Sequence, residues 1–350
     1  MALAVGSESL DNLRVTEPIV DQFERPLRDL RVSVTDRCNF RCRYCMPREV
    51  FGESYEFLPR RAILRFEEIQ RVVRIAAELG VRKVRITGGE PLLRRDLPQL
   101  VSMLAQIEGI ELALTTNGSL LAQQAEALAE AGLERVTVSL DSLDDDVFRL
   151  MNDAEFAVAQ VLEGIEAAAA AGLAPIKINA VVQRGVNDDS VVDLARHFKG
   201  SGQVMRFIEF MDVGTTNQWR PEDVCSGAEI VERVTAEFPA EPIEPAYRGE
   251  VAKRWRYADG EGEFGVITSV TQPFCGDCTR ARLSAEGVLY TCLFAAEGTD
   301  LRDTLRSGGS DKTLRTLLAG IWSSREDRYS ERRFEDGKPL SRIEMSYIGG

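Results

Sequence analysis

The chain has 350 residues, of which 44% are hydrophobic and 28% are charged. This composition excludes a disordered or fibrous protein and supplies enough apolar side chains for a sizeable core. The 43 Lys and Arg residues against 56 Asp and Glu residues give a formal net charge of −13. A general binder of nucleic acid or of an anionic membrane is therefore not expected, and a polyanionic ligand would need a local basic site.

Histidine and cysteine usage narrows the chemistry further. His197 is the single histidine, so hydrolase triads and His-rich zinc sites have at most one candidate residue. Seven cysteines in a chain of this length are not the dense framework of a small secreted domain. Residues 1–13 lack the basic start and apolar run of a signal peptide, and no stretch reaches about 18 consecutive apolar residues. We therefore expect a cytoplasmic protein with reduced thiols.

Strand-like and helix-like segments alternate after a polar N-terminal arm, residues 1–24. Apolar runs predict strands at 30–35, 81–87, 112–116, 136–140, 176–182 and 204–211. Helical periodicity predicts helices between them, at 66–79, 96–107, 120–131, 158–171 and 191–198. Because two parallel strands need a crossover, usually a helix, the alternation predicts parallel β/α units. Six units fit either a doubly wound sheet or an open, partial barrel, with ligands in the turns after the strands.

The alternation fades after residue 211. One further helix is expected at 228–237, and the segment 247–265 is rich in charge and glycine. A second group of cysteines begins shortly afterwards. We therefore place a boundary near residue 245, with a core of residues 25–245 and a C-terminal region of residues 246–350.

Three cysteines follow the first predicted strand with the spacing C-x3-C-x2-C, namely Cys38, Cys42 and Cys45. Three thiolates so close together suit a soft metal centre, and nearby arginines such as Arg41 would favour the thiolate form. A structural zinc site needs four protein ligands, so zinc would require one from elsewhere in the chain. A [4Fe–4S] cluster held by three cysteines instead leaves one iron free to bind a small molecule.

A second triple, Cys275, Cys278 and Cys292, has the spacing C-x2-C-x13-C. It also lacks a fourth ligand nearby, which favours a second cluster with an open iron. A zinc ribbon is the alternative, because C-x2-C suits zinc as well. The remaining Cys225 either completes one of the sites or is an ordinary buried thiol.

Basic residues within predicted strands form another group. Arg280 and Arg282 alternate beside Cys278, so both guanidinium groups point the same way and can reach one anion, although a solvated strand face would look alike. Cations also occur within the earlier predicted strands, where burial requires a partner: Arg31, Lys83, Arg85, Lys177 and Arg206. Converging cations of this kind suit a triphosphate.

The chain closely resembles the GTP 3′,8-cyclase family of the radical S-adenosylmethionine superfamily, from about residue 31 to its end. The motifs that carry the resemblance are DRCNFRCRYCMP, RITGGEP, TTNG, SLDSL, KINAVV, RFIEFM, FCGDCTRARLS and the terminal Gly349-Gly350. The resemblance implies an α/β fold, a partial (β/α)6 TIM-type barrel of parallel strands with a C-terminal extension that carries a second cluster. It also implies a cytoplasmic lyase that converts GTP to 3′,8-cyclo-7,8-dihydro-GTP, the first step of molybdenum cofactor biosynthesis.

The resemblance further implies roles for individual residues. The first triple would hold a [4Fe–4S] cluster that cleaves S-adenosylmethionine, and the second triple a [4Fe–4S] cluster whose open iron holds the guanine. The implied neighbours of S-adenosylmethionine are Tyr44, Gly89, Ser139 and Met211. Those of GTP are Arg31, Arg85, Thr115, Lys177, Arg280, Ala281 and Arg282, with Lys83 and Arg206 as further candidates. The Gly349-Gly350 tail would enter the active site, where it and Arg31 are the implied catalytic residues.

The implied reaction takes a hydrogen atom from C3′ of GTP with a 5′-deoxyadenosyl radical and joins C3′ to C8 of the guanine. Expected partners are an electron donor such as flavodoxin or ferredoxin and, downstream, cyclic pyranopterin monophosphate synthase. No nucleic acid or membrane partner is expected, and the assembly is a monomer or homodimer. A radical enzyme that modifies a peptide is the alternative, whereas a plain GTPase is disfavoured because no G-x4-G-K-[ST] sequence occurs.

Overall fold

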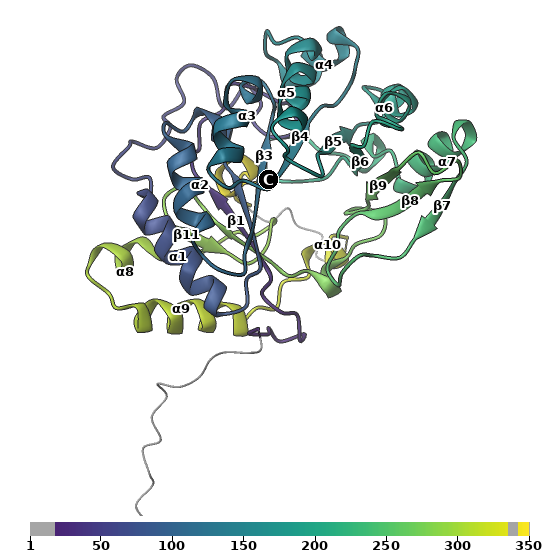
Figure 1. The fold of residues 1–350 in the computed structure, drawn as a ribbon. Coiled ribbons are helices and arrows are strands. Elements are labelled where there is room, and N and C mark those ends of the chain that lie inside the picture. The colour runs from purple at the N-terminus through teal and green to yellow at the C-terminus, as the bar shows by residue number, and fades with distance from the viewer. Residues whose placement is uncertain (1–17, 335–341, 350) are drawn as a thin grey trace, which may run out of the picture.

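One continuous sheet organises the chain. The computed structural model describes residues 18–334 and 342–349. Its twelve strands follow the order β12-β11-β10-β1-β2-β3-β4-β5-β6-β9-β8-β7, and neighbours from β10 through β9 are parallel. The sheet curves, and helices cover its outer face (Figure 1). This is the α/β architecture of an open, partial barrel.

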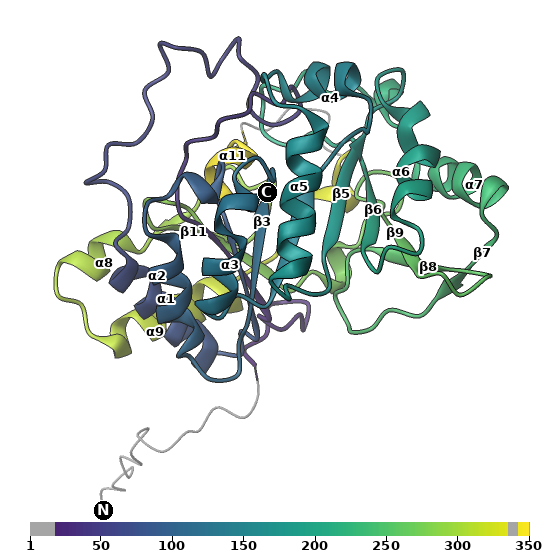
Figure 2. The same cartoon turned by 45° about the horizontal axis from the view of Figure 1, so that its top comes forward.

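The six predicted strands are confirmed. They are β1 (Asp29–Ser33), β2 (Lys83–Thr87), β3 (Glu111–Thr116), β4 (Arg135–Ser139), β5 (Lys177–Val182) and β6 (Val204–Glu209). The predicted crossover helices are α1 (Phe66–Glu78), α2 (Leu97–Ala105), α3 (Leu121–Glu130), α5 (Val158–Ala170) and α6 (Val191–Phe198). A short helix that the periodicity missed, α4 (Asp145–Asn152), precedes α5. Figure 2 shows these helices side by side along the sheet.

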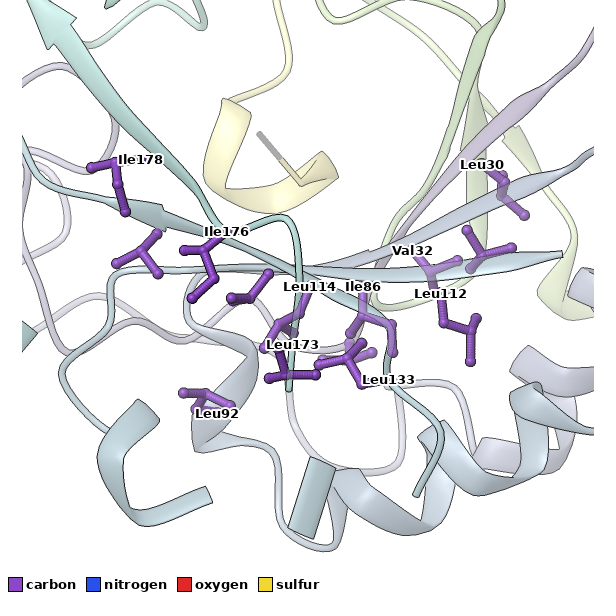
Figure 3. Close-up of a cluster of buried hydrophobic side chains, with 14 of the residues drawn as sticks. Leu30, Val32, Ile86, Leu92, Leu112, Leu114, Leu133, Leu173, Ile176 and Ile178 are labelled. Atoms are coloured by element: carbon purple, nitrogen blue, oxygen red, sulfur yellow. The ribbon is translucent and has the colours of Figure 1, made fainter. Parts of the chain in front are cut away.

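Alternation along each strand separates the core from the interior of the barrel. In β1, Leu30 and Val32 are buried against the helices, whereas Asp29 and Arg31 line an interior cavity. Figure 3 shows the apolar side of several strands packed into one cluster, with the pale yellow C-terminal helix on the other face of the strands. Because parallel strands are covered on one face by their crossover helices, polar side chains can gather only on the other face.

The C-terminal region extends the sheet at both of its edges. After α7 (Gly227–Glu237), the chain adds β7 (Ala240–Ile243), β8 (Lys253–Tyr257) and β9 (Glu263–Ile267) beside β6. It then returns to the opposite edge as β10 (Arg280–Leu283), β11 (Val288–Tyr290) and β12 (Thr299–Asp300). The sequence analysis did not predict these strands; β7, at the edge of the sheet, contains a proline, and β8 carries three basic residues, so neither shows an apolar run. The proposed boundary near residue 245 falls between β7 and β8, inside this sheet.

The last helices complete the outer layer and then turn inward. α8 (Arg302–Arg306) and α9 (Asp311–Ser323) lie beside α1, and α10 (Tyr329–Arg332) follows. α11 (Met345–Ile348) contacts β1, so this last described helix lies on the barrel side of the sheet. No helix of the described ranges is both long enough and apolar enough to cross a membrane.

Candidate active site

The two cysteine triples lie at opposite ends of one cavity. Cys38, Cys42 and Cys45 follow the carboxyl end of β1, whereas Cys275 and Cys278 precede the amino end of its parallel neighbour β10. The third cysteine of the second triple follows the antiparallel strand β11, which brings it back to that same end. The prediction that functional residues follow the carboxyl ends of strands is therefore wrong for the second triple, because β10 had not been predicted.

The loop that carries the first triple is held by its own backbone and by Arg41. The amide groups of Cys45 and Met46 donate to the carbonyl oxygen of Cys42 at 2.9 and 2.8 Å. Arg41 Nη1 donates to the carbonyl oxygen of Cys38 at 2.8 Å. Burial, followed by the charge of Glu90, raises the pKa of Cys38 to about 12, and this outweighs the opposing effect of Arg41. Arg41 thus favours the thiolate of Cys38, as expected, but it does not offset burial, and a bound metal centre would stabilise the thiolate further.

The GGEP turn after β2 packs against the first cysteine loop. A Cβ atom at Gly89 would lie 2.3 Å from the carbonyl oxygen of Arg37, and one at Gly88 would lie 2.6 Å from that of Thr35. The amide of Gly89 donates to Thr35 O at 2.8 Å. The double glycine thus lets the two turns touch, and it positions the cavity-lining backbone of Gly89 next to the cysteines.

Glu90 of the same turn is buried and joins the ends of β2 and β3. Its carboxylate accepts hydrogen bonds from Thr116 Oγ1 and from the amide of Asn117, both at 2.7 Å, and from the amide of Leu92 at 3.0 Å. Burial raises the pKa of Glu90 to about 7 in spite of these bonds. The motif string contained Glu90, but sequence reasoning gave it no role.

The implied neighbours of S-adenosylmethionine all face the cavity: Tyr44, Gly89, Ser139 and Met211. The hydroxyl of Tyr44 donates to Asp141 Oδ2 at 2.8 Å, and the other carboxylate oxygen accepts from the amide of Val181 at 2.8 Å. Asp141 therefore fixes Tyr44 against the sheet. The sequence analysis missed this aspartate, although it lies in the SLDSL motif.

Between the triples, basic side chains from neighbouring strands line the cavity. Arg31 is the register partner of Arg282 on one side and of Arg85 on the other. Arg85 Nη1 donates to Thr115 Oγ1 at 3.1 Å and to Thr137 Oγ1 at 3.0 Å. The cations on strands that line the cavity, called the cation array below, are Arg31, Lys83, Arg85, Lys177, Arg206, Arg280 and Arg282.

Ala281 differs from the other implied neighbours of GTP. Its side chain is buried in the hydrophobic core, on the face of β10 opposite to Arg280 and Arg282. Only its backbone could therefore meet a ligand in the cavity.

The cation array is strongly self-repelling. Burial, followed by the charges of Arg282, Arg280 and Arg85, lowers the pKa of Arg31 well below its usual range. Burial, together with neighbouring cations, lowers the pKa of Lys177 to about 7 and that of Lys83 to about 8. Such an array is stabilised by an anion that contacts several of these groups at once.

Charge acts differently on the cysteines of the second triple. Burial raises the pKa of Cys278, but Arg280 and Arg325 outweigh it and bring the value to about 6. Arg280 Nη2 lies 3.4 Å from Cys278 Sγ. Burial, followed by the charge of Asp327, raises the pKa of Cys292 to about 12. The second triple therefore combines one thiol that ionises easily with one that needs a metal centre to do so.

The cysteines of the two triples do not form a ready-made site for a single metal ion. In residues 18–334 and 342–349, no three His, Cys, Asp or Glu side chains converge where one metal ion could bind. A [4Fe–4S] cluster binds each thiolate through a different iron and so keeps its ligands further apart than zinc does. Cys225 is buried in the core and is not among the described residues that line the cavity, so it completes neither triple.

The C-terminal tail reaches the cation array. Arg282 Nη1 donates to the carbonyl oxygen of Gly349, and Met345 and Ser346 line the cavity. Gly349 has a φ of +77°, and a Cβ atom there would lie 2.1 Å from Thr87 Oγ1. Glycine is therefore required on both conformational and steric grounds. Gly350 lies outside the described residues.

Acidic groups attach the tail to the loop after β6. Glu344 accepts hydrogen bonds from the amide and the hydroxyl of Thr215, both at 2.9 Å. Asp212, next to Met211, pairs with Arg333 and Arg342 at 2.8 Å. The loop near the implied S-adenosylmethionine site thus also anchors the tail.

Comparison with known proteins agrees with this architecture. A family model for the Radical SAM superfamily matches residues 32–198, and one for Molybdenum Cofactor Synthesis C matches residues 203–331. Among solved structures, Streptococcus suis SuiB bound to S-adenosylmethionine has a TM-score of 0.60 at 17% identity and covers 87% of this chain and 69% of that chain. Native anSMEcpe with bound AdoMet has a TM-score of 0.55 at 14% identity and covers 91% of this chain and 93% of that chain. These low identities show the fold alone.

Comparison of sequences identifies much more similar proteins than the comparison of structures does. GTP 3′,8-cyclase of Acidothermus cellulolyticus is 53% identical and covers 96% of this chain and 100% of the relative. GTP 3′,8-cyclase of Xanthomonas axonopodis pv. citri is also 53% identical, with the same coverage. GTP 3′,8-cyclase of Staphylococcus saprophyticus is 47% identical over 96% of this chain and 100% of the relative. Given this similarity along nearly the whole length, the chain belongs to the GTP 3′,8-cyclase family of radical S-adenosylmethionine proteins.

Proposed function

We propose that this protein converts GTP to 3′,8-cyclo-7,8-dihydro-GTP, the first step of molybdenum cofactor biosynthesis, with S-adenosylmethionine and two [4Fe–4S] clusters. The observation that carries the proposal is the cation array between two three-cysteine loops in one cavity. The array alone would suit any polyphosphate, and the cysteines alone would suit electron transfer. Their combination favours radical chemistry on a nucleoside triphosphate.

Cys38, Cys42 and Cys45 would hold the first cluster, which with bound S-adenosylmethionine supplies the reducing electron and the hydrogen-abstracting radical. The backbone at Gly89 would bind the amino group of S-adenosylmethionine. Tyr44, Ser139 and Met211 would orient the rest of that molecule. Asp141 supports this arrangement because it fixes the hydroxyl of Tyr44.

The cation array would hold GTP with its triphosphate near Lys177, Lys83, Arg85 and Arg206, where Thr115 orients Arg85. Arg31, Arg280 and Arg282, with the backbone of Ala281, would position the nucleotide near the second triple. Cys275, Cys278 and Cys292 would hold a cluster whose open iron binds the guanine. The Gly349-Gly350 tail would occupy the barrel beside Arg282, where it excludes water from the reacting carbon.

The alternative reaction, modification of a peptide, has less support. The relatives that are about half identical over nearly the full length carry the cyclase name, whereas the resemblance to SuiB lies in the fold. We also propose that a flavodoxin or ferredoxin donates the electron and that cyclic pyranopterin monophosphate synthase uses the product. We further propose that the protein is a cytoplasmic monomer or homodimer without nucleic-acid or membrane partners.

An anaerobic assay tests the function. Protein purified without oxygen should contain roughly eight iron atoms per chain and form the cyclised product, identified by mass spectrometry, from GTP, S-adenosylmethionine and dithionite. Cys38→Ser should abolish cleavage of S-adenosylmethionine, whereas Cys275→Ser should retain it and lose GTP turnover. Zinc in place of iron, or no product from GTP, would contradict the proposal.

A further inference from the structure

A buried network of one aspartate and two arginines lies beside the second cysteine triple. Arg25 Nε donates to Asp21 Oδ2 at 2.6 Å, and Arg325 Nη1 donates to the same oxygen at 3.1 Å. The side chains of Asp21 and Arg25 are 0% exposed and that of Arg325 is 2% exposed. One carboxylate from the N-terminal arm thus joins two guanidinium groups that are 300 positions apart in the sequence.

This network holds the backbone at every cysteine of the triple. Arg25 Nη1 donates to the carbonyl oxygen of Cys275 at 2.7 Å. Arg325 Nη1 donates to that of Cys278 at 2.8 Å, and Arg325 Nε donates at 3.0 Å to that of Thr291, the residue before the third cysteine. Three separate stretches of backbone are therefore tied to two side chains, which fixes the relative positions of the three thiols.

Trp322 makes the network rigid. Its indole Nε1 donates to the carbonyl oxygen of Arg25 at 3.0 Å, and the guanidinium of Arg325 lies 4.6 Å from the centre of its ring system. Trp322 is 1% exposed, so neither arginine can move without disturbing the core. The two arginines that hold the backbone of the second triple are thus themselves fixed by the packing of Trp322.

The fully buried part of the network carries a surplus of positive charge. Two guanidinium groups face one fully buried carboxylate, and the other carboxylate in contact with Arg325, that of Asp327, is 30% exposed, so water weakens its interaction with Arg325. Arg25 Nη2 is buried and has no hydrogen-bond partner in the described part of the chain. Because burial of a cation without a matching anion is strongly unfavourable, an anionic neighbour is expected. A cluster bound by three thiolates is such an anion.

We propose that Asp21, Arg25 and Arg325 are positioning residues for the second cluster, which set the geometry of its three thiolates and raise its reduction potential. The inference rests on the proposed function, because it needs iron at the second triple. Net charge, hydrogen bonds and burial set the potentials of iron–sulfur clusters. A fixed positive charge favours the reduced cluster, which carries one more electron than the oxidised one.

A potentiometric titration of the anaerobically reconstituted full-length chain tests the inference. Cys38→Ser serves as the background, so that the signal of the second cluster is followed alone by electron paramagnetic resonance. Arg325→Gln removes a positive charge and should make the cluster about tenfold harder to reduce, a midpoint about 59 mV lower. Asp21→Asn removes a negative charge and should shift the midpoint in the opposite direction. Arg325→Lys keeps the charge and should stay near the starting value.

Arg315→Gln is the matched control. Arg315 lies on α9 and pairs with exposed Glu78, so its loss removes the same charge without a contact to the cysteine loops. Equal midpoints in the background, Arg325→Gln and Asp21→Asn would overturn the inference. If Arg325→Gln does not fold, Asp21→Asn and Arg325→Lys still test the inference. Only an electrostatic role raises the midpoint of Asp21→Asn and leaves the midpoint of Arg325→Lys unchanged. Absence of iron from the second triple without any substitution in the network would instead overturn the proposed function.

Discussion

Arg31 and Arg282 are register partners in the parallel pair of β1 and β10. Two like charges therefore lie side by side where the first strand of the barrel pairs with the strand that follows Cys278. Arg85 stands at the same level on the other side of β1. Like charges on directly opposite positions of a sheet destabilise it. This arrangement therefore does not serve the stability of the fold, and we expect an anionic ligand to stabilise it.

Replacing Arg31 should increase the stability of the ligand-free protein but weaken the binding of GTP. Arg31→Met keeps the length of the side chain and removes its charge, so the free energy of unfolding without ligand should rise by up to about 1 kcal/mol. GTP affinity should fall at least about tenfold, because charge-assisted contacts to phosphate or base are lost. Thermal melts with and without GTP measure both effects. Arg149→Met is the control, because Arg149 forms an exposed pair with Asp145 and lies outside the cation array. A lower melting temperature of ligand-free Arg31→Met would contradict the prediction.

GTP affinity should depend on pH through Lys177. Burial and neighbouring cations lower the pKa of Lys177 to about 7, so its amine is mostly neutral in the free protein above that pH. A polyphosphate binds the charged form, so binding at higher pH must take up a proton. Affinity should therefore fall, by at most about tenfold per pH unit for this group, as the pH rises from about 7.5 to 8.5.

Calorimetry in buffers of different ionisation enthalpy measures the proton uptake directly. Lys177→Gln should bind GTP more weakly and with a smaller uptake. Lys83, whose pKa burial lowers to about 8, should account for uptake that persists in that variant. Net proton release on binding, or an affinity that rises with pH over this range, would show that the lysines do not contact the phosphates.

The tail should tolerate no side chain at Gly349. Gly349→Ala would bring a Cβ atom to 2.1 Å from Thr87 Oγ1 and would also strain a φ of +77°. GTP turnover should be lost while S-adenosylmethionine cleavage remains, because the first cysteine loop is untouched. Gly308→Ala is a close control, since Gly308 has a φ of +82° but open space around it. Full GTP turnover by Gly349→Ala would contradict the prediction, whereas an equal loss in both variants would point to backbone strain instead of the position of the tail.

Gly89 should control the first cluster. Gly89→Ala would place a Cβ atom 2.3 Å from the carbonyl oxygen of Arg37 and so push the cysteine loop away from the GGEP turn. Iron content should fall by about half, to the amount of the second cluster alone, and S-adenosylmethionine cleavage should disappear. Gly320→Ala, at a helical glycine with nothing within 4 Å, should leave the iron content unchanged. Full iron loading of Gly89→Ala would contradict the steric argument.

Features that depend on nearby residues could be predicted from the sequence. The strands from β1 to β6 and their crossover helices follow from the periodicity of apolar residues, because each element buries one face against the next. The first cysteine triple was evident from its spacing, since its three thiols lie within eight residues, whereas the second was suggested by C-x2-C followed by a more distant cysteine. Family resemblance then connected them to a fold and a reaction.

Features that depend on distant pairing could not be predicted. Whether Arg280 and Arg282 face solvent or a ligand depends on the pairing of β10 with β1, which joins positions 251 residues apart. Neither β7 nor β8 shows an apolar run: β7 is an edge strand and contains a proline, whereas β8 lies between β7 and β9 but carries three basic residues.

Tertiary structure also decided where the chemistry lies. Spacing identified the two triples, but only the direction of β10 in the sheet put them at opposite ends of one cavity. Likewise, no local pattern links Asp21 to Arg325, whose contact forms when the N-terminal arm and the end of α9 pack on the same loop. Local periodicity determined the elements, and cysteine spacing with the family motifs indicated the kinds of ligand, whereas long-range strand pairing and burial decided which side chains meet.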